Sequence, residues 1–418
     1  MLNSEWPKLG ELAGVKIVLG VCGSIAVYKA AYLVRELCAI GACVRVVMTE
    51  GALAFMQPMT FQALSGEAVA CDLLNEQAER AMGHIELARW ADYLLIAPAS
   101  ASFIAKIAHG IADDLLSTLY LATVAPVIIC PAMNQNMWAH PATIANCALL
   151  RDRGALFCGP DIGSQACGDM GLGRMVEPET IASTLRLYPV HNIFQGKEFL
   201  ITAGPTREAI DPVRYLSNYS SGKMGYALAQ AAQIAGARVT VISGPCALLA
   251  PFGVRRIQVN SAEDMLTAVM AHLKPNSVFI GAAAVADYRI IAPKTEKLKR
   301  QDNESMTLVL QKNPDILAAV VASKQAAMVI GFAAETHDVL THAAAKLAAK
   351  QVDMIIANQV GEGLGFETED NQVTILTAKQ QIPLAFASKI TLAGQIMLMI
   401  AQTLENDVRS CYEPGYSN

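Results

Sequence analysis

The sequence predicts an α/β protein with two doubly wound, mainly parallel-sheet domains of the Rossmann-like kind. Short apolar segments alternate with helical patterns along both halves of the 418 residues, which is typical of parallel sheets covered on both faces. A glycine turn follows the first apolar segment of each half, at Cys22-Gly23-Ser24 and Gly204-Pro205-Thr206, as in α/β proteins that present backbone N–H groups to a phosphate. The pattern relaxes around Tyr188–His191, so we expect two anion-binding domains, 1–190 and 191–418.

The first half contains strand candidates that alternate with helical patterns. The expected strands are Lys16–Val21, Val44–Thr49, Tyr93–Ala97, Val127–Cys130 and Ala155–Cys158. The expected helices are Ala26–Ala39, Pro58–Ser65, His84–Trp90, Ser100–Ala108, Asp114–Ala122 and Pro141–Arg153. Because ligands of open α/β sheets bind outside the carboxyl ends of the strands, we expect the site of this half there.

The second half repeats the alternation. The expected strands are Phe199–Thr202, Arg238–Ser243, Arg255–Val259, Val278–Ala282, Met328–Phe332 and Met354–Ala357, followed by a hairpin of Gln372–Leu376 and Ile382–Leu384. The expected helices are Met224–Ala235, Ser261–His272, Asn313–Ala322, His337–Lys350 and Ser388–Leu404. The segment Ala292–Asn303 is lysine-rich and has no periodicity. A loop of that length is usually either functional or disordered.

Composition narrows the class of protein. Hydrophobic residues make up 53% of the chain and charged residues 17%, yet proline, glycine or a charge interrupts every long apolar stretch short of the ~20 residues of a membrane span. The surplus apolar surface favours subunit interfaces, so we expect a homo-oligomer and no membrane partner. The net charge is −5 and the basic residues do not cluster, which argues against a nucleic-acid partner.

The N-terminal residues and the cysteines indicate the compartment. The first residues lack the apolar core of an export signal. Ten cysteines are scattered along the chain without a CxxC pair, which fits reduced thiols better than disulfides or a zinc site. We therefore expect a cytoplasmic protein.

The first glycine turn and two hydroxyl residues are weak candidates for a binding site. Gly20–Ala26 is not a GxGxxG motif and has no acidic residue at the distance of a ribose partner. It could hold one phosphate at a helix N-terminus, or it could be a plain tight turn. The hydroxyls of Thr49 and Ser117 could donate to a flavin or a phosphate, although taken singly each is more often a helix cap or a solvated polar group.

A more specific signal is Pro131–Trp138, PAMNQNMW, directly after an apolar strand. Its Asn134 is an amide with no obvious capping role. His84 begins a helix upstream, where a lone histidine is more often a cap than a catalyst. Downstream, glycines surround Cys167 in the segment Gly163–Met175, which predicts a mobile flap.

The second half offers a longer polar cradle. Ser220–Gly225 starts an alanine-rich helix and Asn218 supplies an amide beside it. Gly281–Tyr288 has small residues after a strand, where a base and ribose could approach the backbone, and Asp287 could bond a ribose hydroxyl or face a cation. The loop that follows carries Lys294, Lys297, Lys299 and Arg300. These cations are either a solvated face or, beside a nucleotide, a means of neutralising pyrophosphate.

These motifs carry a resemblance to a known family. The histidine motif at His84, the complete PxMNxxMW motif at Pro131–Trp138 and the flap cysteine Cys167 resemble the flavin-dependent cysteine decarboxylases. Ile201–Gly225 is similar to the pattern ITAGPTRE…DPVRY.SN.SSGKMG. From about Val15 to about Gln402 the chain resembles the bacterial bifunctional phosphopantothenoylcysteine decarboxylase/phosphopantothenate–cysteine ligases of coenzyme A biosynthesis. The chain departs from many relatives at Ala97–Phe103, APASASF, and at Cys22.

For the first half, the resemblance implies an FMN-dependent decarboxylase. Cys167 would be the proton donor, Asn134 would hold the substrate carboxylate and His84 would assist thiol oxidation and decarboxylation. The implied flavin contacts are Gly23, Ser24, Ile25, Thr49, Ser100, Ser117 and Met133. A flavin can oxidise CH₂–SH to a thioaldehyde, whose C=S group accepts the charge left when CO₂ departs.

For the second half, the resemblance implies a ligase that activates 4'-phosphopantothenate with CTP and Mg²⁺ as an acyl-cytidylate, which the amine of cysteine then attacks. Asn218 would contact the reacting carboxyl and Lys297 would be catalytic. The implied nucleotide contacts are Gly281, Ala282, Ala283, Asp287, Asn313, Pro314, Asp315, Ile316, Phe332, Lys346 and Lys350. Ligands of the metal are not assigned. Relatives form trimers through the flavin domain and dimers through the ligase domain, which together would give a dodecamer.

Two other functions fit the sequence less well. A two-domain NAD(P)-dependent oxidoreductase is disfavoured because both halves lack GxGxxG and the acidic ribose partner. A non-catalytic flavin carrier is disfavoured because a carrier needs neither PAMNQNMW nor a flap cysteine.

Overall fold

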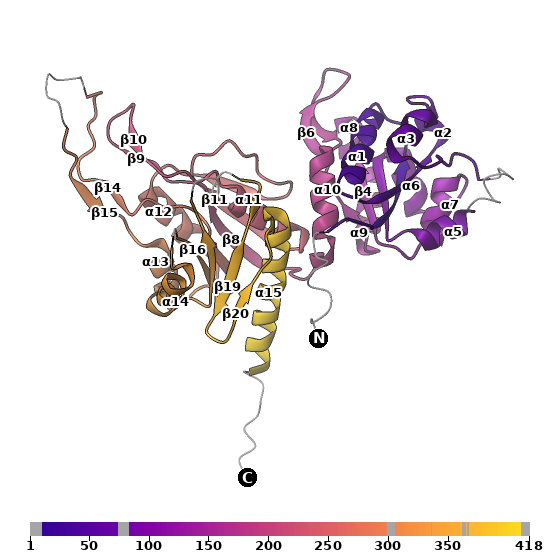
Figure 1. Cartoon of the computed structure of the whole chain (residues 1–418). Coiled ribbons are helices and arrows are strands. Elements are labelled where there is room, and N and C mark those ends of the chain that lie inside the picture. Colours follow the sequence, from indigo (N-terminus) through magenta and orange to yellow (C-terminus); the bar gives the residue numbers. More distant parts are fainter. Residues whose placement is uncertain are drawn as a thin grey trace, which may run out of the picture. The chain divides into compact units, whose positions relative to one another are not determined.

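The computed structural model describes residues 11–73, 83–298, 306–335, 337–361, 365 and 368–410. The described chain forms two compact units, one from Glu11 to Leu185 and one from Arg186 onward (Figure 1). The boundary expected after residue 190 lies a little further along, at the end of the short helix η2, Tyr188–Val190. Within the described residues, no helix combines the length and apolar character needed to cross a lipid bilayer.

The N-terminal unit is built on a five-stranded parallel sheet in the order β2-β1-β3-β4-β5. Its strands are β1 Lys16–Val21, β2 Cys43–Met48, β3 Tyr93–Ala99, β4 Val127–Pro131 and β5 Leu156–Phe157. Strand β1 pairs with β2 on one side and with β3 on the other. The strand order therefore reverses beside β1, and such a point is where doubly wound sheets hold ligands.

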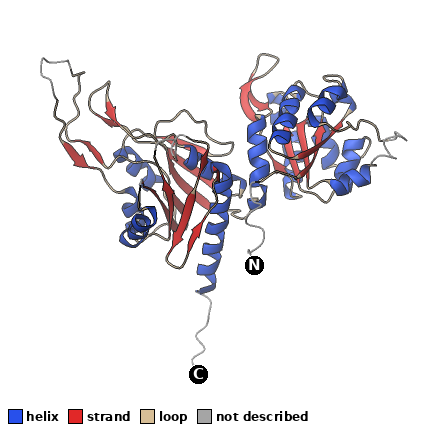
Figure 2. Ribbon diagram, in the orientation of Figure 1, coloured by secondary structure: helices blue, strands red, loops and turns tan. Residues whose placement is uncertain are grey.

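Helices cover both faces of this sheet (Figure 2). They are α1 Val27–Ala39, α2 Glu50–Leu53, α3 Pro58–Ser65, α5 His84–Trp90, α6 Ala101–Ala108, α7 Leu115–Ala122, α8 Gln135–Ala139, α9 Pro141–Asp152 and α10 Pro178–Leu187. One core cluster joins the strands to α5, α6, α7 and α9, for example through Val18, Ile96 and Ile104. Helix α1 buries Val27, Leu33 and Leu37 along its own apolar face.

The C-terminal unit has an eight-stranded sheet in the order β12-β11-β8-β13-β16-β17-β19-β20. Its strands are β8 Glu198–Ala203, β11 Arg238–Ser243, β12 Arg255–Gln258, β13 Val278–Gly281, β16 Met328–Glu335, β17 Met354–Gln359, β19 Val373–Thr377 and β20 Gln381–Pro383. The strands from β12 to β17 pair in parallel, whereas β19 and β20 are antiparallel. The expected fold class and the late hairpin are both confirmed.

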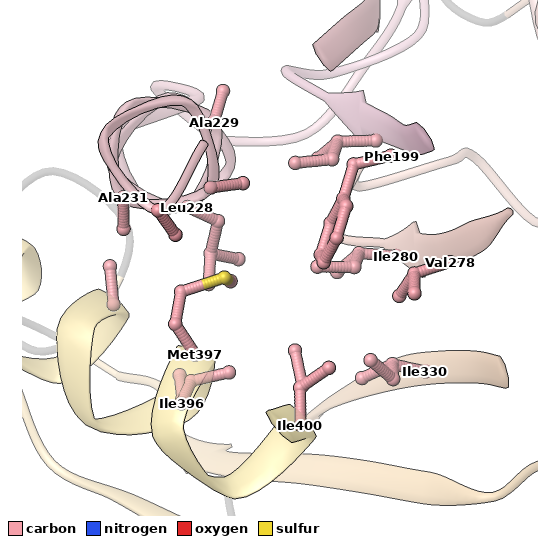
Figure 3. Close-up of a cluster of buried hydrophobic side chains, with 14 of the residues drawn as sticks. Phe199, Leu228, Ala229, Ala231, Val278, Ile280, Ile330, Ile396, Met397 and Ile400 are labelled. Carbon is pink, nitrogen blue, oxygen red and sulfur yellow. The ribbon is translucent and has the colours of Figure 1, made fainter. Parts of the chain in front are cut away.

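The helices of this unit are α11 Lys223–Ile234, α12 Ala262–His272, α13 Ile316–Ser323, α14 Val339–Lys350 and α15 Lys389–Ser410. Figure 3 shows Phe199, Ile280 and Ile330 of the sheet facing Leu228 of α11 and Ile400 of α15. A second cluster packs α12, α13 and α14 against the sheet. Removing this apolar surface from water on both faces is the main stabilising contribution.

Four small hairpins or ladders were not expected from the sequence. They are β6–β7 (Asp161–Ser164 and Met170–Arg174), β9–β10 (Glu208–Ala209 and Tyr215–Leu216), β14–β15 (Tyr288–Ile290 and Leu310–Lys312) and β18–β21 (Asp370–Asn371 and Ala387–Ser388). The segment expected to be a mobile flap is therefore the β6–β7 hairpin. Two helices begin later than expected, at Ile316 and Val339. Asp315 fixes the start of the first of these helices, because its carboxylate caps the helix N-terminus by accepting from the Ala318 N–H at 2.9 Å.

Candidate active sites

Four loops of the N-terminal unit meet at one edge of its sheet, because each follows the carboxyl end of a parallel strand. The predicted cofactor residues stand in these loops: Gly23, Ser24 and Ile25 after β1, Thr49 after β2, Ser100 after β3 and Met133 after β4. Backbone bonds join neighbouring loops. The Cys22 N–H donates to the Pro98 carbonyl at 3.1 Å, and the Ala132 N–H donates to the Ala99 carbonyl at 2.9 Å.

The loop after β1 is open at the start of helix α1. No side chain caps this helix, and the side chain of Ile25 is 61% exposed. Gly23 packs against the loop after β2, where an added Cβ would lie 2.8 Å from the carbonyl oxygen of Gly51. The glycine thus permits a close approach of two loops beside an accessible helix N-terminus.

The β6–β7 hairpin brings Cys167 to Asn134. The Asn134 amide Nδ2 lies 3.4 Å from Cys167 Sγ, 3.1 Å from Gln165 Oε1 and 3.1 Å from Asp169 Oδ2. The Cys167 thiol donates to Asp169 Oδ2 at 3.4 Å. The other end of the amide accepts from the Asn136 N–H at 2.8 Å, so Asn134 caps helix α8. The expectation that Asn134 has no capping role was wrong.

The C-terminal unit has a cavity of about 260 Å³ at the carboxyl edge of its sheet. Almost every predicted nucleotide residue lines it: Gly281, Ala283, Asp287, Asn313, Pro314, Asp315, Ile316, Phe332, Lys346 and Lys350. These residues come from the ends of β13 and β16, the start of α13 and the face of α14. Asn313 is held there because its amide donates to the Ala286 carbonyl at 2.8 Å.

Two lysines of α14, Lys346 and Lys350, contribute positive charge to this cavity. Lys350 pairs with Asp315. Burial opposes ionisation of Asp315, but the Lys350 ammonium and a backbone N–H outweigh it and lower the pKa of this carboxyl. Lys346 donates to the Phe332 carbonyl at 2.6 Å. Burial lowers the pKa of the Lys346 ammonium, which nearby carboxylates only partly offset.

A second cavity of about 230 Å³ adjoins the first, and Ala283, Val285, Phe332 and Lys346 line both. It contains the predicted residue Ala282 and the start of helix α11, from Gly222 to Gly225. Gly222 is the N-cap of α11 and no side chain caps the helix. Asn218 stands nearby, and its amide donates to the Ala284 carbonyl at 2.6 Å. An uncapped helix N-terminus that opens into a cavity is suited to an anion.

The buried lysine Lys389 also lines the second cavity. Its ammonium donates to the carbonyls of Gly365 at 2.7 Å and Thr368 at 2.5 Å. Burial and the neighbouring Lys223 lower the pKa of this ammonium, against the influence of two carboxylates. The cavity therefore has a cation at its wall as well as a helix N-terminus.

Two family models match the chain. Residues 6–187 match the Flavoprotein model, and residues 194–404 match the DNA/pantothenate metabolism flavoprotein C-terminal domain. A coenzyme A biosynthesis bifunctional protein CoaBC of Vibrio parahaemolyticus is 51% identical over 389 residues, which cover 92% of this chain and 98% of that protein. The chain belongs to the CoaBC family of bifunctional coenzyme A biosynthesis proteins.

Other proteins are also similar to the chain. The CoaBC protein of Escherichia coli strain K12 is 49% identical over 394 residues, covering 93% of this chain and 97% of that protein. The crystal structure of the C-terminal domain of a CoaBC protein is 42% identical with a TM-score of 0.45, covering 52% of this chain and 100% of that one. The chain is a bifunctional enzyme with a flavoprotein decarboxylase unit and a ligase unit. These matches do not favour an oxidoreductase or a flavin carrier.

Some predicted site residues of this CoaBC chain have other contacts or lie outside the groups described above. Ser117 is fully buried, and its hydroxyl is bonded to Asp114, whose Oδ1 lies 2.8 Å away in a capping box of α7. The Ser100 hydroxyl accepts from the Phe103 N–H at 3.2 Å and caps α6. Among the described residues, the ring of His84 is not hydrogen-bonded to Asn134 or Cys167. Lys297 is exposed and lines neither cavity of the ligase unit, and the predicted Lys299 and Arg300 lie outside the described residues.

Sequence reasoning missed other residues of these sites. Gln165 and Asp169 flank Cys167 in the hairpin, Lys312 lines the first cavity, and Asn358, Asn371 and Lys389 line the second. Lys389 could have been noticed as a lysine at the start of an apolar closing helix. Lys312 and Asn371 lie in the short strands β15 and β18, and Gln165 and Asp169 lie between β6 and β7. The sequence does not reveal the pairing of these strands.

Replacing Gly173 with alanine is expected to lower decarboxylase turnover about 10- to 100-fold, because small displacements of catalytic groups have effects of this size. Gly173 has a φ of +144°, and an added Cβ would lie 2.2 Å from the Met133 carbonyl oxygen. The hairpin would have to move away from Asn134. Gly66→Ala is the matched control, since its φ is also positive, at +74°, but its Cβ would meet nothing within 4 Å. Equal steady-state turnover of Gly173→Ala and the parent would contradict the view that the hairpin must stay close to Asn134.

Proposed function

We propose that the ligase unit joins cysteine to 4'-phosphopantothenate with CTP, and that the decarboxylase unit then uses FMN to convert the cysteinyl product to 4'-phosphopantetheine. Family membership supports the pair of activities. The observation that carries the decarboxylation to particular residues is the 3.4 Å approach of Asn134 Nδ2 to Cys167 Sγ. These residues come from two segments that meet only through the β6–β7 hairpin.

The loops at the carboxyl edge of the decarboxylase sheet fit a flavin. The uncapped start of α1 and the close Gly23–Gly51 contact leave backbone accessible for a phosphate. Gly23, Ser24, Ile25, Thr49, Ser100, Ser117 and Met133 are the proposed contacts. When bound, FMN supplies the oxidation that turns CH₂–SH into a C=S electron sink. Because the Ser117 hydroxyl already serves a capping box, its proposed contact would compete with the bond to Asp114.

The chain's own residues have separate tasks in the decarboxylation. The Asn134 amide now donates to oxygens of Gln165 and Asp169, and a substrate carboxylate can replace these acceptors. The Cys167 thiol carries its proton toward Asp169 and is exposed, so it can deliver that proton to the enethiol product. His84 is proposed to assist the earlier thiol oxidation and decarboxylation.

In the ligase unit, the first cavity is proposed to bind CTP. Lys346 and Lys350 would neutralise phosphate charge, which grows on pyrophosphate as it leaves. Mg²⁺ is proposed to accompany the triphosphate, because this ion is usually held by substrate phosphates and one or two carboxylates. Asp287 lines the cavity and could serve the cation or a ribose hydroxyl. Lys297 is proposed as the catalytic lysine.

The second cavity is proposed to hold the substrate that CTP activates. The start of α11 and the ammonium of Lys389 come from separate parts of the chain, and both attract anions. Asn218 would contact the carboxylate as it becomes an acyl-cytidylate. Because a free carboxylate is a poor acyl donor, its conversion to a nucleotide ester is the decisive step before cysteine attacks.

A homo-oligomer is proposed from exposed apolar side chains in each unit. In the ligase unit they gather on the β9–β10 and β14–β15 segments, for example Tyr215 at 48% and Val309 at 64% exposure. In the decarboxylase unit they lie on the neighbouring helices α1 and α3, for example Tyr32 at 64% and Met59 at 78%. Trimers of one unit and dimers of the other would give the dodecamer, which light scattering can measure. The proposed compartment is the cytoplasm, where Cys167 would stay reduced.

Three measurements on the purified full chain test the proposed function. The absorbance spectrum should show flavin peaks, with FMN identified by mass. Phosphopantothenoylcysteine should release CO₂, and phosphopantothenate with cysteine should release pyrophosphate from CTP. A colourless protein without CO₂ release would overturn the decarboxylase activity, and a strong preference for ATP would overturn the proposed nucleotide.

A further inference from the structure

Asp211 is a buried carboxylate in the turn between β9 and β10. Its side chain has no exposed surface. Oδ1 accepts from the backbone N–H groups of Val213 and Arg214, each at 2.8 Å. Oδ2 accepts from the N–H of Leu298 at 3.1 Å. The third donor is remote in sequence, so this carboxylate joins its own turn to the loop that carries Lys297.

Two more bonds join the same segments. The Arg214 guanidinium donates to the Leu298 carbonyl at 2.8 Å, and the Lys294 N–H donates to the Ile210 carbonyl at 3.0 Å. The attachments therefore fall on both sides of Lys297. Figure 1 shows the β9–β10 and β14–β15 hairpins extending from the same end of this unit.

The β9–β10 segment is itself bonded to the wall of the first cavity. The Thr206 N–H donates to the Ala284 carbonyl at 3.2 Å, and the Ala286 N–H donates to Thr206 Oγ1 at 3.0 Å. The Glu208 carboxylate accepts from the Ala262 N–H at 2.9 Å, where helix α12 begins. A continuous set of bonds thus runs from the cavity wall through the turn to the backbone beside Lys297.

The chemistry of Asp211 suits an anchor. Burial opposes its ionisation, but the three backbone N–H groups and the Arg214 guanidinium outweigh burial and lower the pKa of the carboxyl. An ionised carboxylate has acceptor sites on both oxygens and can bind donors from both segments at once. An asparagine has only one acceptor oxygen, so it must release either its own turn or Leu298.

We propose that Asp211 is a positioning residue of the ligase reaction, which holds the backbone around Lys297 in register with the nucleotide cavity. The proposal rests on the proposed catalytic role of Lys297. Asp211 acts through that lysine and touches no reacting atom. Its loss should therefore matter only while Lys297 is present.

The test is a double-mutant cycle on the full chain, measured as CTP-dependent pyrophosphate release. Asp211→Asn is expected to lower kcat about 10- to 100-fold with less than about a threefold change in KM for CTP. In a Lys297→Ala background, the same substitution should lower kcat less than about threefold further. Equal fold-losses in both backgrounds would overturn the proposal. Asp264→Asn is the matched control, because Asp264 accepts from the Ser261 N–H at 3.0 Å and has no hydrogen bond to the described part of the lysine loop, up to Leu298.

Hydrogen exchange tests the anchor without relying on activity. The Leu298 amide should exchange about tenfold faster or more in Asp211→Asn than in the parent, because a bond to a charged acceptor is lost. Unchanged exchange would overturn the anchor. Faster exchange together with full ligase activity of Lys297→Ala would instead remove the proposed role of Lys297 and leave Asp211 as an anchor with no catalytic effect. Intact CTP affinity shows that Asp211→Asn has folded; if that affinity is lost, Asp211→Glu takes its place in both measurements.

Discussion

Replacing Cys167 with serine is expected to stop the decarboxylase after CO₂ has left, with the oxidised enethiol as the accumulated product. A serine hydroxyl is a much weaker acid than a thiol, whose ordinary pKa is about 8.5. Loss of a positioned proton donor lowers turnover about 10²- to 10⁴-fold. The serine oxygen would keep the contact with Asn134 that Sγ makes at 3.4 Å, so substrate binding should persist.

Mass spectrometry of the product and the visible absorbance of the flavin measure this arrest. The flavin band should bleach once and fail to recover, because the returning hydride is not consumed. Cys43→Ser is the control, since Cys43 is also an exposed free cysteine but lies on β2, away from the hairpin. Normal turnover of Cys167→Ser would show that another group donates the proton.

Replacing Lys346 with methionine is expected to lower the kcat/KM of the ligase for CTP about 10²- to 10³-fold, the loss typical of one buried donor to developing charge. Lys346 lines both cavities and is fixed by its bond to the Phe332 carbonyl at 2.6 Å. Methionine keeps the length and apolar stem of the side chain while removing the ammonium. The pyrophosphate-release assay measures the loss, and decarboxylation by the same sample should be unchanged.

The pH dependence of ligation has a definite sign. Burial lowers the pKa of Lys346, and only the protonated ammonium can neutralise phosphate. CTP use should therefore fall as pH rises, starting below the ordinary lysine value of 10.5. Lys346→Arg should move this alkaline limit upward, because arginine stays charged. Lys379→Met, which changes an exposed lysine between β19 and β20, should leave both activity and pH profile unaltered. A flat profile for the parent would exclude Lys346 as the titrating group.

Much of the first site could be predicted because local sequence places its residues after parallel strands. Strand β4 leads directly into Asn134, and the glycines around Cys167 mark a turn. Their contact was not predictable from periodicity, because the two short strands of the β6–β7 hairpin contain three glycines and show little apolar alternation. Pairing in such segments is set by hydrogen bonds made after the core has formed.

In the ligase unit, too, some cavity residues could be predicted from local sequence and others could not. Asn313–Ile316 and Phe332 stand at strand and helix ends that the apolar pattern locates, and they line one cavity. Lys389, at the start of α15, lines the second cavity together with Gly222. No local sequence pattern connects these two residues. Only the packing of α15 beside α11 brings the two together.

The glycine turns at Gly23 and Gly204 were enough, by sequence alone, to indicate two anion-binding α/β units in one chain, because strand, turn and helix are local structures with local signals. The tertiary structure decided what surrounds each turn. It places the Cys167 hairpin against Asn134 and Asp211 against the backbone beside Lys297. It also places Lys346 of α14 in the wall of both cavities. These contacts join residues far apart in sequence, and they form only when the burial of the shared core offsets the conformational entropy of closing such long loops.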